Sequence, residues 1–407
     1  MKRPRAIGRF ASALAIVTAL SAAYVVSCSL RNLDDIPFPS DDASDHGDTG
    51  APNDARPFDT GNTADGGDRS DADGGPVDAG ATCDADLTSE PRNCGSCGHD
   101  CLRGDCQQGK CQPFMLSDAA GTLSITTSGG MVFWTEANPP RVVGAPTDGG
   151  AARISATFNT QVNFIAAYGG TLSIVDFSDR VYRCPASLVN CDISPPIFIG
   201  TQEGGRAVAA DDGGTYWAAQ SIADAGTTIR RYDPRSDAGV VAIGHTPTPH
   251  YVSALAVDDT FVYWPSTTGP AQVWRARKDG TGPPGGEVVA SGLTNPYGVA
   301  VDGTRLYWAD IVDGVQAMNK ATDAAVSLVS NRRTYLLAID PNNFYWTDTL
   351  PDGGVFGCTF SGGCVATLRA YATGESYPTA IAVDDTSIFW TRYTPGGTAG
   401  GVMQVVK

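Results

Sequence analysis

The segment YGVAVDGTRLYWAD, residues 297–310, contains the pattern that decides the fold of this chain. An apolar run ends in an Asp-Gly turn, and a second run follows in which Leu306 and Trp308 alternate with Tyr307. Successive side chains of a strand point to opposite faces, so both faces of this second strand are apolar. The pattern therefore predicts a β-sheet that is covered on both sides.

The aromatic pair of this segment recurs along the chain, which predicts an internal repeat. The copies are MVFWTE (131–136), TYWAA (215–219), FVYWPS (261–266), RLYWAD (305–310), NFYWTD (343–348) and SIFWTR (387–392). A further copy without Trp, YGGTLSIVD (168–176), lies between the first two. The sequence thus contains seven units of about 41 residues.

The unit around Trp308 divides into four strands, which we place at 297–302, 305–309, 314–320 and 325–330. Four-stranded sheets covered on both faces are typical of a ring of blades. We therefore predict an all-β fold, a seven-bladed β-propeller over residues 112–407, with six blades as the alternative. Residues 401–407 read as a third strand, and Pro113–Ser117 aligns with a fourth strand, so we expect the early strand to complete the last blade.

The repeats resemble the YWTD class of propeller repeat, most closely at Tyr345-Trp346-Thr347-Asp348. The NHL class is similar as well. The chain departs from the YWTD pattern because the fourth position is Glu136 or Arg392 in other units, and because YWTD rings have six blades. The resemblance implies a propeller and no particular ligand.

The first 27 residues have the features of a secretory signal peptide. Residues 1–10 carry four cations and no acid, and residues 11–26 form an uncharged apolar run that is short for a membrane span. Val25-Val26-Ser27-Cys28 resembles the bacterial lipobox, which implies a diacylglycerol on Cys28 and cleavage before it. An uncleaved signal anchor is the alternative. Cys28 is also the one cysteine left over when the other ten are paired.

Residues 28–82 are predicted to be a lipid-anchored, acidic, disordered tether. The stretch is rich in Asp, Gly, Pro, Ala, Ser and Thr and has few aliphatic or aromatic residues, so it cannot bury enough apolar surface to offset the entropy of ordering. The formal net charge of the whole chain is −16, which disfavours nucleic acid as a partner.

Residues 83–111 contain six cysteines and form a separate small module. Their spacing, together with Asn93-Cys94-Gly95, resembles the stigma-specific cysteine-rich family, which implies a secreted disulfide module. A zinc or iron–sulfur site is the alternative, because His99 lies among the cysteines. Export favours disulfides, although sequence cannot give their connectivity. The expected disulfide cysteines are Cys83, Cys94, Cys97, Cys101, Cys106 and Cys111.

Two further cysteine pairs, Cys184–Cys191 and Cys358–Cys364, fall at the predicted turn between the third and fourth strands of their units. We expect each pair to form a disulfide that closes a hairpin. Such short loops give a modest stabilisation of roughly 2 kcal/mol.

Two sets of residues are candidates for a functional site. A recurring Asp ends the first strand of five units and either caps a turn or contributes to a ring of carboxylates around a metal. His245 and His250 lie in the connection GHTPTPHY (244–251) and are the candidate catalytic residues, because the architecture resembles the seven-bladed streptogramin lyases, which use a His with acidic partners. We expect turn-capping for the Asp set, and no metal or other cofactor beyond the lipid.

The sequence therefore indicates a membrane-anchored binding or scaffold lipoprotein that presents a propeller to a protein or glycan. The rival interpretation is a lyase- or lactonase-like propeller enzyme with a divalent metal. We expect a monomer in the bacterial cell envelope. Ser29 does not match the Asp of the inner-membrane retention signal, which by analogy favours the outer membrane.

Overall fold

The computed structural model describes residues 86–407, apart from 152, 177, 179, 192–194, 200–202, 222–225, 247–250, 268, 362 and 394–399. The predicted signal peptide, Cys28, the whole tether and Cys83 lie outside the described residues. No described helix is long and apolar enough to cross a membrane.

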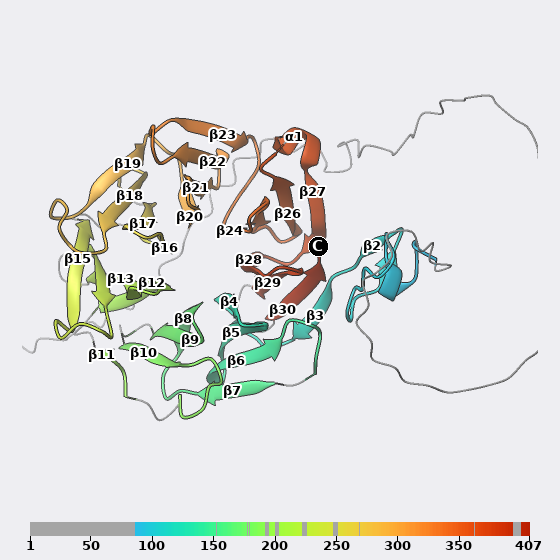
Figure 1. Ribbon diagram of the computed structural model, residues 1–407, viewed down its shortest axis with the longest axis horizontal. Coiled ribbons are helices and arrows are strands. Elements are labelled where there is room, and N and C mark those ends of the chain that lie inside the picture. The colour runs from blue at the N-terminus through green and yellow to red at the C-terminus, as the bar shows by residue number, and fades with distance from the viewer. Residues whose placement is uncertain are drawn as a thin grey trace, which may run out of the picture. The chain divides into compact units, whose positions relative to one another are not determined.

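Seven four-stranded antiparallel sheets are arranged in a ring, which confirms the predicted seven-bladed β-propeller and excludes six blades (Figure 1). Blades 1 to 3 consist of β4 (Ile125–Ser128), β5 (Met131–Ala137), β6 (Pro140–Pro146), β7 (Ile154–Thr157); β8 (Val162–Tyr168), β9 (Thr171–Asp176), β10 (Arg180–Pro185), β11 (Phe198–Ile199); and β12 (Glu203–Asp211), β13 (Gly214–Ser221), β14 (Thr227–Tyr232), β15 (Val240–Thr246).

Blades 4 to 6 follow the same order. Their strands are β16 (Ala256–Val257), β17 (Phe261–Ser266), β18 (Gln272–Arg277), β19 (Glu287–Ser291); β20 (Pro296–Val301), β21 (Arg305–Asp310), β22 (Gly314–Asn319), β23 (Ala325–Val329); and β24 (Leu337–Ile339), β25 (Asn343–Asp348), β26 (Gly353–Thr359), β27 (Arg369–Glu375), with helix α1 (Cys364–Thr367) before β27. The first strand of each blade lies toward the centre of the ring (Figure 1).

Blade 7 is assembled from both ends of the described chain. It contains β28 (Pro378–Val383), β29 (Ser387–Tyr393), β30 (Gly400–Val406) and, as its fourth strand, β3 (Phe114–Ser117). Phe114 pairs with Gln404 and Met115 with Met403 in the antiparallel register. The predicted closing strand is therefore present, and it occupies the edge that β30 would otherwise expose.

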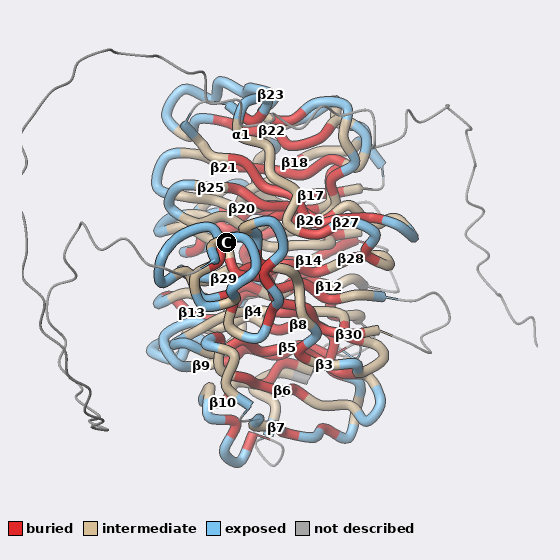
Figure 2. Tube along the Cα trace, turned by 90° about the vertical axis from the view of Figure 1, so that its right-hand side faces the viewer, coloured by how far each residue is buried: buried red, intermediate tan, exposed pale blue. Residues whose placement is uncertain are grey.

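The aromatic pair of each unit packs between neighbouring blades. Tyr307 of blade 5 and Trp346 of blade 6 belong to one buried cluster, and Tyr345 of blade 6 and Trp390 of blade 7 belong to another. The adjacent Tyr and Trp of the second strand thus pack on opposite faces of the sheet, as the alternation of side chains requires. Buried residues run through the strands, and exposed residues gather in the turns at both ends of the blades (Figure 2).

Blade 2 shows how a unit that lacks the aromatic pair is accommodated. Ile174 replaces the Trp and packs in the cluster that contains Phe133 of blade 1. Ser173 replaces the Tyr, and its hydroxyl lies 2.7 Å from the hydroxyl of Thr215 in blade 3. Between blades 2 and 3, a contact between two hydroxyl groups thus takes the place of the aromatic contact found between other blades.

The cysteine-rich module contains a short 3-10 helix (Pro91–Asn93) and a hairpin of β1 (Cys106–Gln107) and β2 (Lys110–Cys111). Four of its cysteines, Cys94, Cys101, Cys106 and Cys111, share a buried cluster with Val406 of β30. His99 Nε2 lies 3.0 Å from the backbone oxygen of Lys407. The module therefore packs directly on the strand that β3 closes.

Leu116→Ala is expected to lower the free energy of unfolding by about 2–4 kcal/mol, because Leu116 of β3 is buried with Ile125 and Trp134 across the closure. Met115→Ala is the matched control: its side chain is 44% exposed, and we expect a change within about 0.5 kcal/mol. Urea unfolding of the full-length chain measures both. Equal midpoints for the two variants would show that β3 does not hold the ring closed.

Candidate functional site

The recurring aspartates cap the turns between first and second strands, as the turn-capping interpretation predicts. In each case an oxygen of the carboxylate accepts the backbone N–H two residues later. The distances are 2.7 Å for Asp211, 2.8 Å for Asp258, 2.6 Å for Asp302, 2.9 Å for Asp340 and 2.9 Å for Asp384. These carboxylates are therefore occupied by the backbone of their own turns.

Three of these aspartates also join neighbouring blades through a lysine that follows a third strand. Lys320 Nζ donates to Asp258 Oδ2 of the preceding blade at 2.8 Å and to the backbone oxygen of Asp302 in its own blade at 2.7 Å. Lys278 and Lys407 make the equivalent contacts with Asp211 and Asp340. Burial alone would raise the pKa of Asp340, but hydrogen bonds from Lys407 and Tyr345 outweigh it and lower the pKa to about 2. The aspartates thus bind lysines and turns, and their geometry does not assemble a metal ring.

Of the two histidines proposed from sequence, His245 lies among the described residues. His245 lies in β15, the outermost strand of blade 3, which corrects its expected place in the connection to the next blade. It pairs with Thr228, whose hydroxyl lies 3.3 Å from Nδ1. No contact between His245 and a carboxylate is present among the described residues. His250 lies outside them.

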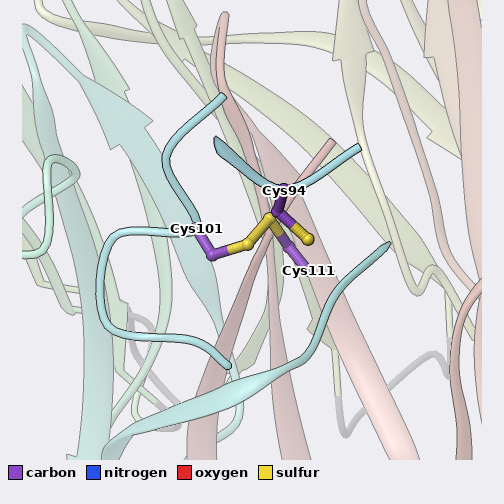
Figure 3. Close-up of side chains that lie close together, drawn as sticks. All are labelled: Cys94, Cys101 and Cys111. Carbon is purple, nitrogen blue, oxygen red and sulfur yellow. A yellow bond between two sulfur atoms is a disulfide. The ribbon is translucent and has the colours of Figure 1, made fainter. Parts of the chain in front are cut away.

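The cysteines of the module are joined in pairs, Cys94 to Cys106 and Cys101 to Cys111, and Cys97 is disulfide-bonded as well. The sulfur atoms of Cys94, Cys101 and Cys111 lie within 4.8 Å of one another (Figure 3). A metal would need these sulfurs as thiolates, and both ring nitrogens of His99 face backbone oxygens, of Cys94 at 2.5 Å and of Lys407 at 3.0 Å. The described arrangement thus fits a disulfide module. In the propeller, Cys184 is bonded to Cys191 and Cys358 to Cys364.

A cluster that the sequence analysis did not single out lies where the inner strands begin. We call it the tyrosine–arginine cluster, and it consists of Arg206 (blade 3), Tyr251 (blade 4), Tyr297 (blade 5) and Tyr335 (blade 6). The ring centroids of Tyr297 and Tyr335 are 4.7 Å apart, and those of Tyr251 and Tyr297 are 6.1 Å apart. The guanidinium of Arg206 lies 5.5 Å from the Tyr251 ring. Four successive blades therefore contribute one side chain each to a continuous aromatic and cationic row.

Irregular pairing of the first strands positions these side chains. In β12 the register shifts between Gly205 and Ala207, and in β20 it shifts between Pro296 and Gly298. Arg206 and Tyr297 are thus the extra residues of β-bulges, which re-aim a side chain relative to its strand. A Cβ on Gly298 would lie 2.9 Å from the Tyr335 backbone oxygen, so glycine is needed for blades 5 and 6 to approach here.

Two tyrosines of the cluster are protonated, and its arginine is held in place by a neighbouring side chain. Burial raises the pKa of Tyr297 and Tyr335 above the ordinary value, and the proximity of the phenols to one another adds to it. Both phenols therefore keep their protons at neutral pH and act as hydrogen-bond donors. Arg206 is oriented by a 2.8 Å hydrogen bond from Nε to Gln220 Oε1.

A signal for the cluster was available in the sequence. Tyr251 and Tyr335 stand shortly before the first strand of their units, and Tyr297 stands at its start. Sequence alone could not show that they meet, because that depends on the bulges and on the close approach of neighbouring first strands.

Several second strands also end in an aspartate, and the carboxylate of one of these, Asp348, has an oxygen without a hydrogen bond from a described residue. Asp310 accepts four backbone N–H groups, from Thr294, Asn295, Val312 and Asp313. Asp348 occupies the same position in blade 6, but its Oδ1 accepts no hydrogen bond from a described residue, and Arg333 Nε lies 3.7 Å away. Burial raises the pKa of Asp348 to about 6, and Arg333 offsets this only in part.

No protein-family model and no curated protein matches the chain. The propeller is similar to a chain in the crystal structure of a nidogen/laminin complex, with 17% identity and a TM-score of 0.43 over 54% of this chain and 84% of that one. It is also similar to the computationally designed Ika8 protein, with 11% identity and a TM-score of 0.47 over 72% of this chain and 98% of that one. Neither similarity bears on what the chain binds.

Asp348→Asn is expected to stabilise the protein by about 1–2 kcal/mol at pH 7.5 and to have little effect near pH 4. Because the pKa in the folded state is raised, stability falls as the pH rises from about 4 to 6 and stays reduced above that. The amide removes the buried charge. Urea unfolding at the two pH values measures the change.

Asp310→Asn is the matched control for this substitution. Its carboxylate is fully buried and accepts four N–H groups, so we expect it to lose stability at pH 7.5. A loss of similar size for Asp348→Asn would contradict the assignment of Asp348 as an unfavourable buried charge.

Proposed function

We propose that the chain is a lipid-anchored envelope protein whose propeller binds a protein or glycan ligand at the tyrosine–arginine cluster. The observation that carries this proposal is the row of three tyrosines and one arginine from four successive blades. Tyr and Arg dominate the binding energy of many interfaces, because each combines a large stacking surface with hydrogen-bond donors.

The chemistry of the cluster favours ligand recognition. The cluster supplies hydrogen-bond donors and a cation, which are the groups that bind hydroxyl, carbonyl or aromatic surfaces. Aromatic faces can stack against the apolar face of a sugar ring or an aromatic side chain, and the phenols and the guanidinium can bond to hydroxyl or carbonyl oxygens.

The cluster lies at the opposite end of the blades from the module. Tyr297 is near the start of β20, whereas the lysine–aspartate contacts follow the ends of the first and third strands. The module contacts Lys407 at this second end, and a pocket of about 530 Å³ there is lined by Asp100, Asp148 and Asp385 among others. The propeller would thus present its binding face away from the point where the tether enters the module.

Cys28 would hold the protein in the membrane, with residues 28–82 as a flexible spacer. Three acyl chains at about 0.8 kcal/mol per buried CH₂ would make release negligible. We propose the bacterial cell envelope, most consistently the outer membrane, as the location. The lipid is the only attached group in this proposal, and a monomer suffices for it.

The double variant Tyr297→Ala, Tyr335→Ala is expected to weaken ligand binding about 30-fold or more, because it removes the stacked centre of the cluster. Binding of the detergent-solubilised full-length chain to glycan microarrays and to immobilised envelope proteins measures this. Tyr168→Ala is the control: Tyr168 is 48% exposed at the far end of its first strand. Retained binding in the double variant, with Tyr168→Ala unchanged, would refute the proposed site.

Cys28→Ala is expected to move the protein from the detergent phase to the aqueous phase on phase separation, because the acyl chains are lost. Ser27→Ala, which leaves the thiol in place, is the comparison and should still partition into detergent. A Cys28→Ala protein that remained in the detergent phase would argue for an uncleaved signal anchor instead.

A further inference from the structure

A pocket of about 330 Å³ lies over one face of blade 6. It is formed by residues of β25, β26 and β27 and by Lys407, which follows β30 of blade 7. We call it the seam pocket, because it lies beside the blade in which β3 joins β30 (Figure 1). It is distinct from the tyrosine–arginine cluster, so a ligand site in this pocket does not depend on the proposed function.

Blade 7, beside the pocket, differs from the other blades in its connections. In blades 1 to 6 the third strand runs on into a connection that leads to the fourth strand of the same blade. In blade 7 the fourth strand is β3, so no such connection crosses from β30. At the preceding blade interface Phe360, which follows β26, stacks 5.2 Å from Tyr307 and 5.6 Å from Phe344. At the seam Lys407 holds the corresponding position, as Lys278 and Lys320 do in blades 4 and 5.

The pocket has an aromatic wall with a glycine beneath it. Tyr345 and Tyr371 meet edge to face with centroids 5.6 Å apart. A Cβ on Gly357 would lie 2.6 Å from the Tyr345 ring and 3.0 Å from the Tyr371 ring, so glycine is required for both rings to sit where they do. Burial raises the pKa of Tyr371, which therefore keeps its proton.

Two cations border the pocket, and they differ in their partners. Lys407 Nζ is paired with Asp340 Oδ2 at 2.7 Å and with the backbone oxygen of Asp384 at 2.5 Å. The guanidinium of Arg369 lies 4.5 Å from the Tyr371 ring and forms no ion pair with any described carboxylate. The side chain lines the pocket, and its charge has no counter-ion among the described carboxylates.

We propose that the seam pocket binds the carboxylate of a small hydroxylated ligand, such as a hexuronic acid residue, through Arg369. A guanidinium binds a carboxylate with two parallel hydrogen bonds, and the fixed orientation over Tyr371 pre-organises it for this. The volume is at the lower end of the range of small-molecule sites and suits one sugar residue. Of the two tyrosines, Tyr345 is fully buried, so the partly buried Tyr371 is the aromatic ring that a sugar can contact.

The charge around the pocket favours a monoanion over a dianion. Asp340 lies beside the pocket and is neutralised by Lys407, so Arg369 contributes the one uncompensated positive charge. A phosphate monoester carries nearly two negative charges, which is more than the single positive charge of Arg369. It would also be repelled by the nearby Asp340 carboxylate. A carboxylate matches the available charge.

Titration of the full-length chain in detergent with galacturonate, galactose and galactose 6-phosphate, followed by calorimetry, tests the proposal. We expect galacturonate to bind at least tenfold more tightly than galactose, because a charged hydrogen bond is added. It should also bind more tightly than the phosphate ester. Arg369→Gln should remove the preference for galacturonate. Arg369→Lys should weaken galacturonate binding several-fold, because an ammonium group cannot form the two parallel hydrogen bonds of a guanidinium.

Arg332→Gln is the matched control, since Arg332 also lies over an aromatic ring of β26, at 5.6 Å from Phe356, but does not line the pocket. It should leave galacturonate affinity unchanged, and thermal unfolding of every variant should match that of the parent. Equal affinity for galactose and galacturonate, tighter binding of the phosphate ester, an unaltered Arg369→Gln titration, or no saturable galacturonate binding up to about 20 mM would each overturn the proposal.

Discussion

The pairing of β3 with β30 is the interaction on which the rest of this structure depends. Each blade buries one face against the blade before it and one against the blade after it, so the ring is stable only when it is closed. Closure is achieved by a strand from residues 114–117 that enters a sheet whose other strands lie beyond residue 377. The pairing brings Leu116 into the layer between blades 7 and 1, with Trp134 and Phe389, and so completes the last of these interfaces.

The closure also determines what lies around it. The cysteine-rich module immediately precedes β3, and its disulfide core packs on Val406 while His99 reaches the backbone of Lys407. The module is thus held against the strand that β3 pairs with. The seam pocket lies beside Lys407, which follows β30 of this blade.

The sequence predicts the repeat and its closure well, because both depend on local patterns. The four strands of blade 5 lie within one or two residues of their predicted bounds, since alternating apolar residues and Asp-Gly turns determine them. His245 was expected in the connection 244–251, yet it pairs with Thr228 and β15 continues to Thr246. The tyrosine–arginine cluster was missed because a bulge shifts Arg206 and Tyr297 out of simple alternation, and a bulge leaves no mark in a period-two pattern.

The strong negative charge of the chain gives little information about its sites, because many acids of the propeller are satisfied internally. Asp258 and Asp340 hold turns and lysines, whereas Asp310 is fully buried and bonded to four backbone N–H groups. On such a protein an anionic ligand gains nothing from long-range attraction, so recognition has to come from contacts at short range. A guanidinium without a carboxylate partner, held over a tyrosine ring as in Arg369, is then more informative than any count of acids. It identifies a place where a charge from outside the described chain completes the arrangement.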